Sequence, residues 1–198
     1  MAELTDIQLD ALREMGNIGA GNSATALSQL ISETIKISVP SVRVVSLESV
    51  PDVLGGPEKQ MYVVYLEVSR ELQGTMLTIF SSETAEFLTR KLLGQDTVDM
   101  KSEIAQSALR EVGSILCGSY LSALSQVVNM SSVASVPALA FDMLGALLDF
   151  ILIEIGQVAD DVFLVEVELY VASTHLECSQ LFLPKPESLT AVLASLGM

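Results

Sequence analysis

The chain has 198 residues, of which 50% are hydrophobic, and a formal net charge of −15. It is long and apolar enough to fold around a core, either as one sizeable domain or as two small fused ones. Its acidity argues against binding to nucleic acids and to anionic membrane surfaces, because both attract lysine and arginine.

In chain order, the first predicted element is a long helix that starts after Thr5. Thr5 and Gln8 form a capping-box pair, and apolar residues follow at helical spacing as far as Leu30. Four β-rich runs come next, within residues 35–81. A second helix is then expected, with a serine cap and a closing glycine at Gly94.

A stretch near the N-terminus, residues 9–31, recurs 97 residues later along the chain. The helix cap recurs as Ser102, and Pro40 recurs as Pro137. Such a match without gaps predicts two repeats of one ancestry. The unchanged residues of the first copy are Ala11, Leu12, Arg13, Glu14, Gly16, Ile18, Gly21, Ala26, Leu27, Ser28 and Gln29.

The expected class is α+β, with long helices packed on a mostly antiparallel sheet, because hairpin-like strands are joined by short turns. We expect one domain over residues 1–198, made of two repeats (about 1–98 and 99–198) with a pseudo-twofold axis. A few extra residues around 139–150 are expected to form a short inserted helix.

Cys117 and Cys178 show neither a disulfide framework nor a zinc-binding spacing, and His175 is the single histidine. These residues favour a reduced, cytoplasmic compartment and disfavour metal or Ser-His chemistry. The acidic N-terminus is unlike a signal peptide, and no apolar stretch is long enough to span a bilayer.

The segment from Glu14 to Asn22 contains Gly16, Gly19 and Gly21 inside the first predicted helix. A phosphate-binding loop needs a strand before the glycines and a helix that starts at them. Neither condition is met, and Gly19 becomes leucine in the second copy. The glycines are better explained as small residues that let this helix approach its neighbours closely.

Asp10, Glu14, Asn17 and Gly21 lie on one face of this helix. Taken alone, they can be an ordinary solvated face. The repetition of their setting, with glycines and a proline at the same distances, favours a functional face that carries Glu14 and Asn17.

The spacing Asp/Ser-x3-Glu-x2-Asn-x22-Pro resembles the signature of the CheC/CheX/FliY phosphatases of chemotaxis. It is met by Asp10, Glu14, Asn17 and Pro40, and in the second copy by Ser107, Glu111, Ser114 and Pro137. The resemblance covers the whole chain. It implies pseudo-symmetric halves with helices on an antiparallel sheet, hydrolysis of the aspartyl phosphate of the response regulator CheY in signal transduction, and binding to the receptor deamidase CheD.

The resemblance also implies roles for individual residues. Asn17 would hold the attacking water in line with the phosphorus, and Glu14 would pair with a lysine of the regulator and fix its docking. Gly16 and Gly21 would leave room for the regulator's loops. No cofactor of its own is expected, because the phosphorylated regulator supplies the Mg2+.

The second copy departs from the signature at Ser114, where an asparagine is expected. The shorter hydroxyl predicts a weak or inactive site, in which Glu111 persists for packing or docking. Either this site keeps its shape, or Leu116 and Tyr120 obstruct docking where the first copy has smaller residues.

Two alternatives remain. One is a CheD-binding adaptor with little catalysis of its own, with residues 141–150 and especially Asp142 as the candidate surface; Met143, Leu144 and Leu147 can equally be core. The other is a structural protein of the flagellar switch, which the lack of an added C-terminal domain disfavours.

Overall fold

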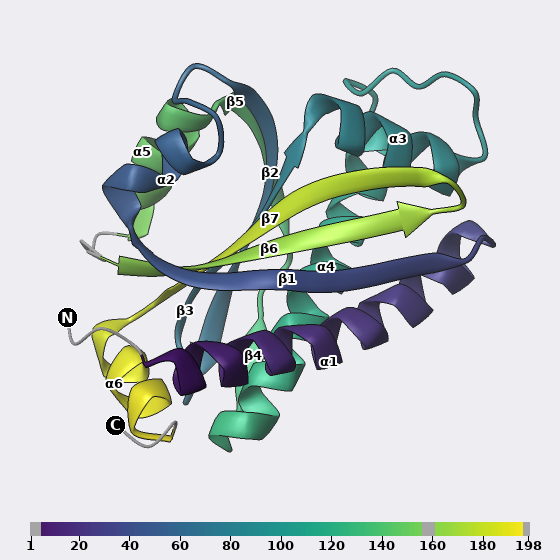
Figure 1. The fold of residues 1–198 in the computed structure, drawn as a ribbon. Coiled ribbons are helices and arrows are strands. Elements are labelled where there is room, and N and C mark those ends of the chain that lie inside the picture. Colours follow the sequence, from purple (N-terminus) through teal and green to yellow (C-terminus); the bar gives the residue numbers. More distant parts are fainter. Residues whose placement is uncertain (1–4, 156–160, 196–198) are drawn as a thin grey trace.

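A seven-stranded antiparallel sheet organises the computed structural model, which describes residues 5–155 and 161–195 (Figure 1). The strand order is β1-β6-β7-β3-β2, and both β4 and β5 pair with the outer side of β2. The strands are β1 (Ile35–Ser46), β2 (Gln60–Arg70), β3 (Gly74–Ser81), β4 (Ser132–Ala134), β5 (Ala138–Met143), β6 (Asp161–Val171) and β7 (Thr174–Pro184).

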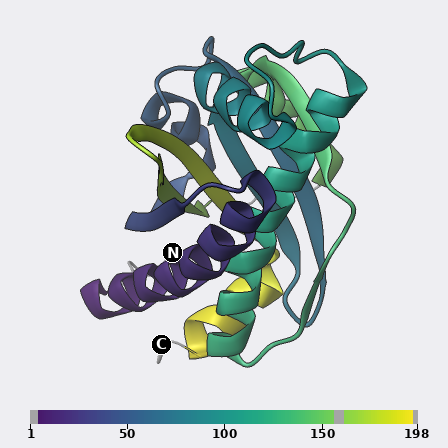
Figure 2. The same cartoon turned by 90° about the vertical axis from the view of Figure 1, so that its right-hand side faces the viewer.

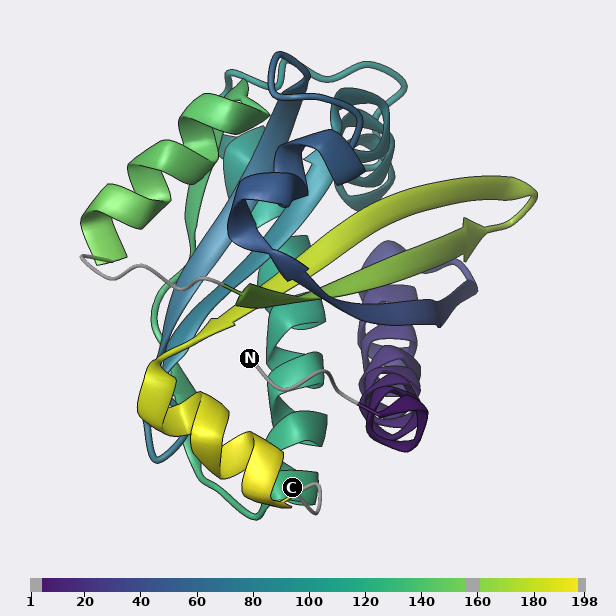
Figure 3. The ribbon, with the colours of Figure 1, turned by 60° about the vertical axis from the view of Figure 1, so that its left-hand side comes forward.

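Helices cover both faces of this sheet. Long helices α1 (Asp6–Ile31) and α4 (Glu103–Val128) lie side by side on one face, with α3 (Ser82–Leu93) beside α4 (Figure 2). Figure 3 shows α2 (Val50–Val53) in front of the strands and α4 behind them. The remaining helices are η1 (Leu47–Ser49), α5 (Leu144–Ile155) and α6 (Pro186–Ser195).

Two hydrophobic clusters result from this layering. The larger cluster lies between the sheet and α1, α3 and α4, and includes Leu12, Leu109 and Phe182. The smaller one joins the opposite face to η1, α2 and α5, through residues such as Leu144 and Leu164. The expected α+β class with helices on an antiparallel sheet is therefore confirmed.

The long helices begin where the sequence predicts. Thr5 and Gln8 form the complete capping box at α1, and the Ser102 hydroxyl accepts a hydrogen bond from the Ala105 N–H at α4. Each helix is 26 residues long, and each ends at a residue in the left-handed conformation, Ser32 or Asn129. None of the helices in the described ranges has the length and hydropathy needed to cross a membrane.

The sheet interleaves the two parts of the chain. β1 pairs with β6, whereas β4 and β5 pair with β2. On the predicted division near residue 98, each half therefore supplies the outer strand that completes the other half's side of the sheet.

The segment around 139–150 differs from its prediction. It does not form an inserted helix alone, because residues 138–143 form strand β5 and α5 starts at Leu144. Alternation of apolar residues over Leu139, Phe141 and Met143 suits a strand on the sheet edge. At the corresponding position, after β1, the first part of the chain has the short helices η1 and α2.

At Gly19, α1 closely approaches the backbone of α4. A Cβ atom at this position would lie 2.9 Å from the Ser119 carbonyl oxygen and 3.0 Å from the Tyr120 Cα. Leu116 and Tyr120 are buried in the core. Their bulk points inward, so the suggestion that they obstruct docking at the second copy is wrong.

This packing predicts opposite effects for two glycines of α1. Gly19→Ala forces a methyl group against the backbone of α4, and we expect overpacking to cost about 1–3 kcal/mol, only partly offset by alanine's higher helix propensity of about 1 kcal/mol. At Gly21 a Cβ atom would meet nothing within 4 Å, so Gly21→Ala should stabilise the protein by up to about 1 kcal/mol. Urea unfolding of both variants checks this; equal effects at the two positions would contradict the packing.

Candidate functional site

The polar face of α1 is mostly exposed to solvent. Asp10, Glu14 and Gly21 are exposed, and Asp10 forms a surface ion pair of 2.9 Å with Arg13. No hydrogen bond or ion pair joins the Glu14 carboxylate to another residue in the described parts of the chain. Glu14 is therefore available to an external partner.

Asn17 lies differently, at the edge where α1 meets β1. Its side chain is half-buried, and its Oδ1 atom accepts a hydrogen bond of 3.0 Å from the backbone N–H of Val39. The sequence predicted only that Asn17 shares a functional helix face with Glu14. In the structure the carboxamide also joins the helix to the strand.

A β-bulge explains why the Val39 N–H is free for this bond. Ser38 pairs with Glu168 and Ser41 pairs with Glu166, so two residues of β1, Val39 and Pro40, oppose a single residue of β6. A bulge leaves a residue outside the ladder, and Pro40 has no N–H to offer. Val39 is buried, so its N–H needs a partner within the protein.

The bond also fixes what the Asn17 amide can offer to a ligand. Because an N–H faces it, the atom that points at Val39 must be the carbonyl oxygen. The NH2 group and the second lone pair of the oxygen remain for a ligand. The amide is thus held in one orientation beside the exposed Glu14, one helical turn away.

Two of the small residues in the motif have different surroundings. A Cβ atom at Gly16 would lie 3.0 Å from a methyl carbon of Val39, so glycine allows the close approach of α1 to β1 without displacing the Val39 side chain. Gly21 faces open space, and packing gives no reason for a glycine there. Ile18, between them, is 48% exposed although its spacing fits the apolar pattern of the helix.

The second copy keeps the bulge and lacks the bond. The Ser135 N–H donates to the Glu67 carbonyl, which leaves Val136 and Pro137 opposite a single residue of β2. Val136 is 88% exposed, whereas Val39 is 4% exposed.

On α4 the equivalent polar residues lie apart from the segment that carries Val136 and Pro137. Ser107 and Glu111 are exposed, and Ser114 is half-buried. No hydrogen bond links the Ser114 side chain to any residue that the structure describes. The reason is the position of the helices, since α1 packs along β1 while α4 packs mainly against α1 and α3.

Asp142 lies on the outermost strand, β5, and is exposed. Its carboxylate accepts a hydrogen bond of 2.7 Å from the Met143 N–H. Phe141 and Met143 are each 45% exposed, whereas Leu144 and Leu147 are buried. Of the three residues that could be core, Met143 is therefore a surface residue.

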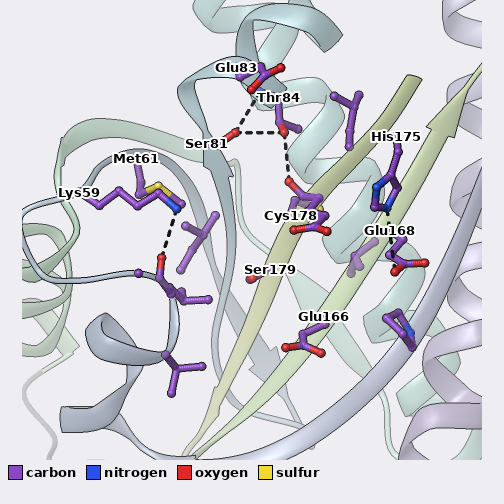
Figure 4. A pocket seen from close by; sticks show the side chains of 18 residues that line it. Lys59, Met61, Ser81, Glu83, Thr84, Glu166, Glu168, His175, Cys178 and Ser179 are labelled. Carbon is purple, nitrogen blue, oxygen red and sulfur yellow. Dashed lines mark hydrogen bonds and ion pairs between the residues drawn. The ribbon is translucent and has the colours of Figure 1, made fainter. Parts of the chain in front are cut away.

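A cavity of about 670 Å³ lies away from all of these residues except Pro40 (Figure 4). Its lining includes Glu166 and Glu168, but these carboxylates are already engaged, Glu166 with Arg43 and Glu168 with Ser38. Glu14 and Asn17 do not line it. The predicted site is an exposed helix face, which suits a macromolecular ligand better than a small molecule.

Neither cysteine provides a nucleophile. Both are free and buried, and burial raises the pKa of the Cys117 thiol to about 12 and raises the pKa of Cys178 as well. Both thiols are therefore protonated near neutral pH.

Comparison with known proteins defines the class of this fold and site. The sequence model of the CheC-like family matches residues 7–44, which include most of α1 and most of β1 with its bulge. The structure of FliY from Thermotoga maritima superposes with a TM-score of 0.77 at 22% identity, covering 99% of this chain and 98% of that one, which shows the same fold.

Two curated relatives are closer in sequence. The CheY-P phosphatase CheC of Bacillus subtilis is 34% identical over 196 residues, covering 96% of this chain and 94% of that protein. The flagellar motor switch phosphatase FliY of the same organism is 30% identical over 130 residues, which cover 34% of its length. The chain belongs to the CheC-like family.

The structure predicts that Asn17 contributes to stability. Asn17→Ala leaves the buried Val39 N–H unpaired, which should lower the free energy of unfolding by about 1–3 kcal/mol. The matched variant Ser114→Ala removes no bond of this kind and should change it by no more than about 0.5 kcal/mol. Urea unfolding of the two variants side by side is the measurement, and a smaller loss at position 17 than at 114 would rule out the bond.

Proposed function

We propose that this protein is a CheY-P phosphatase, a hydrolase that removes the phosphoryl group from the aspartate of the phosphorylated response regulator. The observation that carries the proposal is the face of α1, where an oriented Asn17 amide lies one turn from the exposed Glu14 carboxylate. The 34% identity to a CheY-P phosphatase over nearly the whole chain supports the same conclusion.

The reaction needs little from the phosphatase. Water adds to phosphorus while the bond from phosphorus to the aspartyl oxygen breaks; the aspartate leaves as a carboxylate, and the water's protons remain with inorganic phosphate and solvent. Mg2+ and a lysine, both supplied by the regulator, balance the charge of the phosphoryl oxygens. Positioning of the water is then the main contribution of this chain.

Asn17 supplies that positioning in the proposal. The second lone pair of Oδ1 can accept a hydrogen bond from the attacking water, and the NH2 group can donate a hydrogen bond to a phosphoryl oxygen. An amide does both without titrating, so no histidine or other acid-base group is required.

Glu14 acts in docking. Its exposed carboxylate would pair with the regulator's lysine, and the open surface over Gly21 would admit a loop of the regulator. Ile18, exposed beside both, would add apolar contact. Glu111 could dock a second regulator, but Ser114 would not support hydrolysis of that regulator's aspartyl phosphate. This protein would work in the cytoplasm, where its regulator is phosphorylated, with no metal of its own.

Asn17→Asp separates catalysis from folding. An aspartate can still accept the Val39 N–H, so stability should stay close to that of the wild type. It has no NH2 group and places a negative charge near the phosphoryl oxygens, so the maximal rate of CheY-P hydrolysis should fall by roughly 10²- to 10³-fold. Release of inorganic phosphate at saturating CheY-P is the assay, and a rate within threefold of the wild type would remove Asn17 from the site.

Glu14→Gln tests docking. The affinity for CheY-P should fall about three- to thirtyfold, as for an ion pair at an interface, with the maximal rate largely recovered at high regulator concentration. The loss should shrink as ionic strength rises. Glu187→Gln makes the same charge change at an exposed position of α6 and serves as the control. A defect confined to the maximal rate would contradict docking.

A second candidate function is binding of CheD, and the exposed strand β5 favours it. Phe141 and Met143 expose apolar surface on one face of this outer strand and Asp142 exposes a carboxylate on the other, a mixture of apolar and charged groups that suits a protein interface. An adaptor of this kind could regulate receptor deamidation with little catalysis of its own.

Asp142→Lys tests this surface. Calorimetric titration with CheD should show binding weakened by at least tenfold, because the substitution reverses a charge in the contact. CheY-P hydrolysis should be unchanged, since β5 is remote from the Asn17 face of α1. Glu187→Lys controls for the change in net charge, and wild-type affinity of Asp142→Lys for CheD would remove Asp142 from the surface.

A further inference from the structure

The backbone N–H of Val39 is the only donor described on the Asn17 side chain, and its availability depends on the bulge at Pro40. Elsewhere α1 is joined to β1 by a similar bond, in which the Ser28 hydroxyl accepts from the Ile35 N–H at 2.8 Å. The Ser28 bond holds the same helix to the same strand without touching Asn17. The structure thus contains one bond that orients the amide and one that only attaches the helix.

We infer that the Val39 N–H, presented by the Pro40 bulge, is a positioning group that sets the orientation of the Asn17 amide for the attacking water. This inference rests on the proposed phosphatase function. Without the bond, the carboxamide is free to rotate about its terminal torsion, which has a broad range. A water held by a rotating amide spends less time in line with the phosphorus.

The motif's spacing between Asn17 and Pro40 has a physical reason in this arrangement. Asn17 lies where α1 packs along β1, Gly16 allows the close approach, and Pro40, which has no N–H, follows Val39 in the bulge that leaves the Val39 N–H out of the ladder. Asparagine, glycine and proline thus all serve the contact at Val39. Glu14 has no part in it and contributes through the regulator alone.

The second copy acts as an internal control. It has a bulge at Val136 and Pro137, yet Val136 is turned to solvent and α4 does not run along this strand. An asparagine introduced at position 114 would therefore lack the positioning bond. On this inference the second site is inactive for two reasons: Ser114 replaces the asparagine, and no backbone N–H is placed to orient an amide there.

The decisive experiment replaces Val39 by its α-hydroxy analogue, so that an ester takes the place of the amide and only the N–H is lost. The maximal rate of CheY-P hydrolysis should fall by roughly ten- to a hundredfold, with the affinity for CheY-P unchanged within twofold. Ser28→Ala, which removes the other bond between α1 and β1, should lower stability and leave the rate unchanged. An ester variant with the wild-type rate would overturn the inference.

Two further measurements test the inference even if the ester variant folds poorly. The Val39 amide should exchange slowly with solvent in the wild type and in Asn17→Asp, and much faster in Asn17→Ala; equal exchange in all three would overturn the inference without reference to activity. In an Asn17→Ala background, Ser114→Asn should restore no hydrolysis, and recovery to within tenfold of wild type would show that an amide without the bond suffices.

These outcomes distinguish the inference from the function on which it rests. If Asn17→Asp keeps full activity, the proposed site is wrong, whatever the exchange of Val39. If Asn17→Asp is inactive and the ester variant is fully active, the phosphatase assignment stands and the positioning role of Val39 falls.

Discussion

The candidate site is organised around one buried N–H group that the sheet cannot use. The bulge in β1 sets Val39 and Pro40 against a single residue of β6, so the Val39 N–H points away from the ladder. A buried donor must find an acceptor, and Asn17 provides it from α1. Gly16 favours the same contact, because a Cβ atom there would press against the Val39 side chain. Helix position, strand irregularity and amide orientation are thus consequences of one bond.

Much of the fold could be predicted because its signals are local. Thr5, Gln8 and Ser102 mark helix starts through bonds within a few residues, and the long helices and antiparallel strands follow from hydrophobic spacing. Strand β5 was missed, since Leu144 and the residues after it continue an apolar run that suits a helix, and spacing alone does not show where a strand gives way to one.

The sequence nominates the residues of the candidate site, but it does not predict their geometry. Spacing places Glu14 and Asn17 on one helix face, but it does not reveal that the Asn17 oxygen is already bonded to Val39, because that contact depends on tertiary packing. The same limit applies to Leu116 and Tyr120. Their size suggested an obstruction, and only the crossing of α1 with α4 shows that they fill the core. Roles in docking and water positioning stay predictions until they are assayed.

The pairing of β1 with β6 has a consequence for the order in which the protein is made. Ile35 leaves the ribosome long before Val171, its partner in the sheet. Until β6 is made, β1 has no neighbouring strand. The bulge cannot form without that pairing, and the Val39 N–H is not yet directed toward α1. Long-range pairing of this kind carries a large loop-closure entropy and forms late. A truncated or stalled chain would therefore carry Glu14 and Asn17 without the strand geometry beside them, so the candidate site takes up its geometry only after β6 is synthesised.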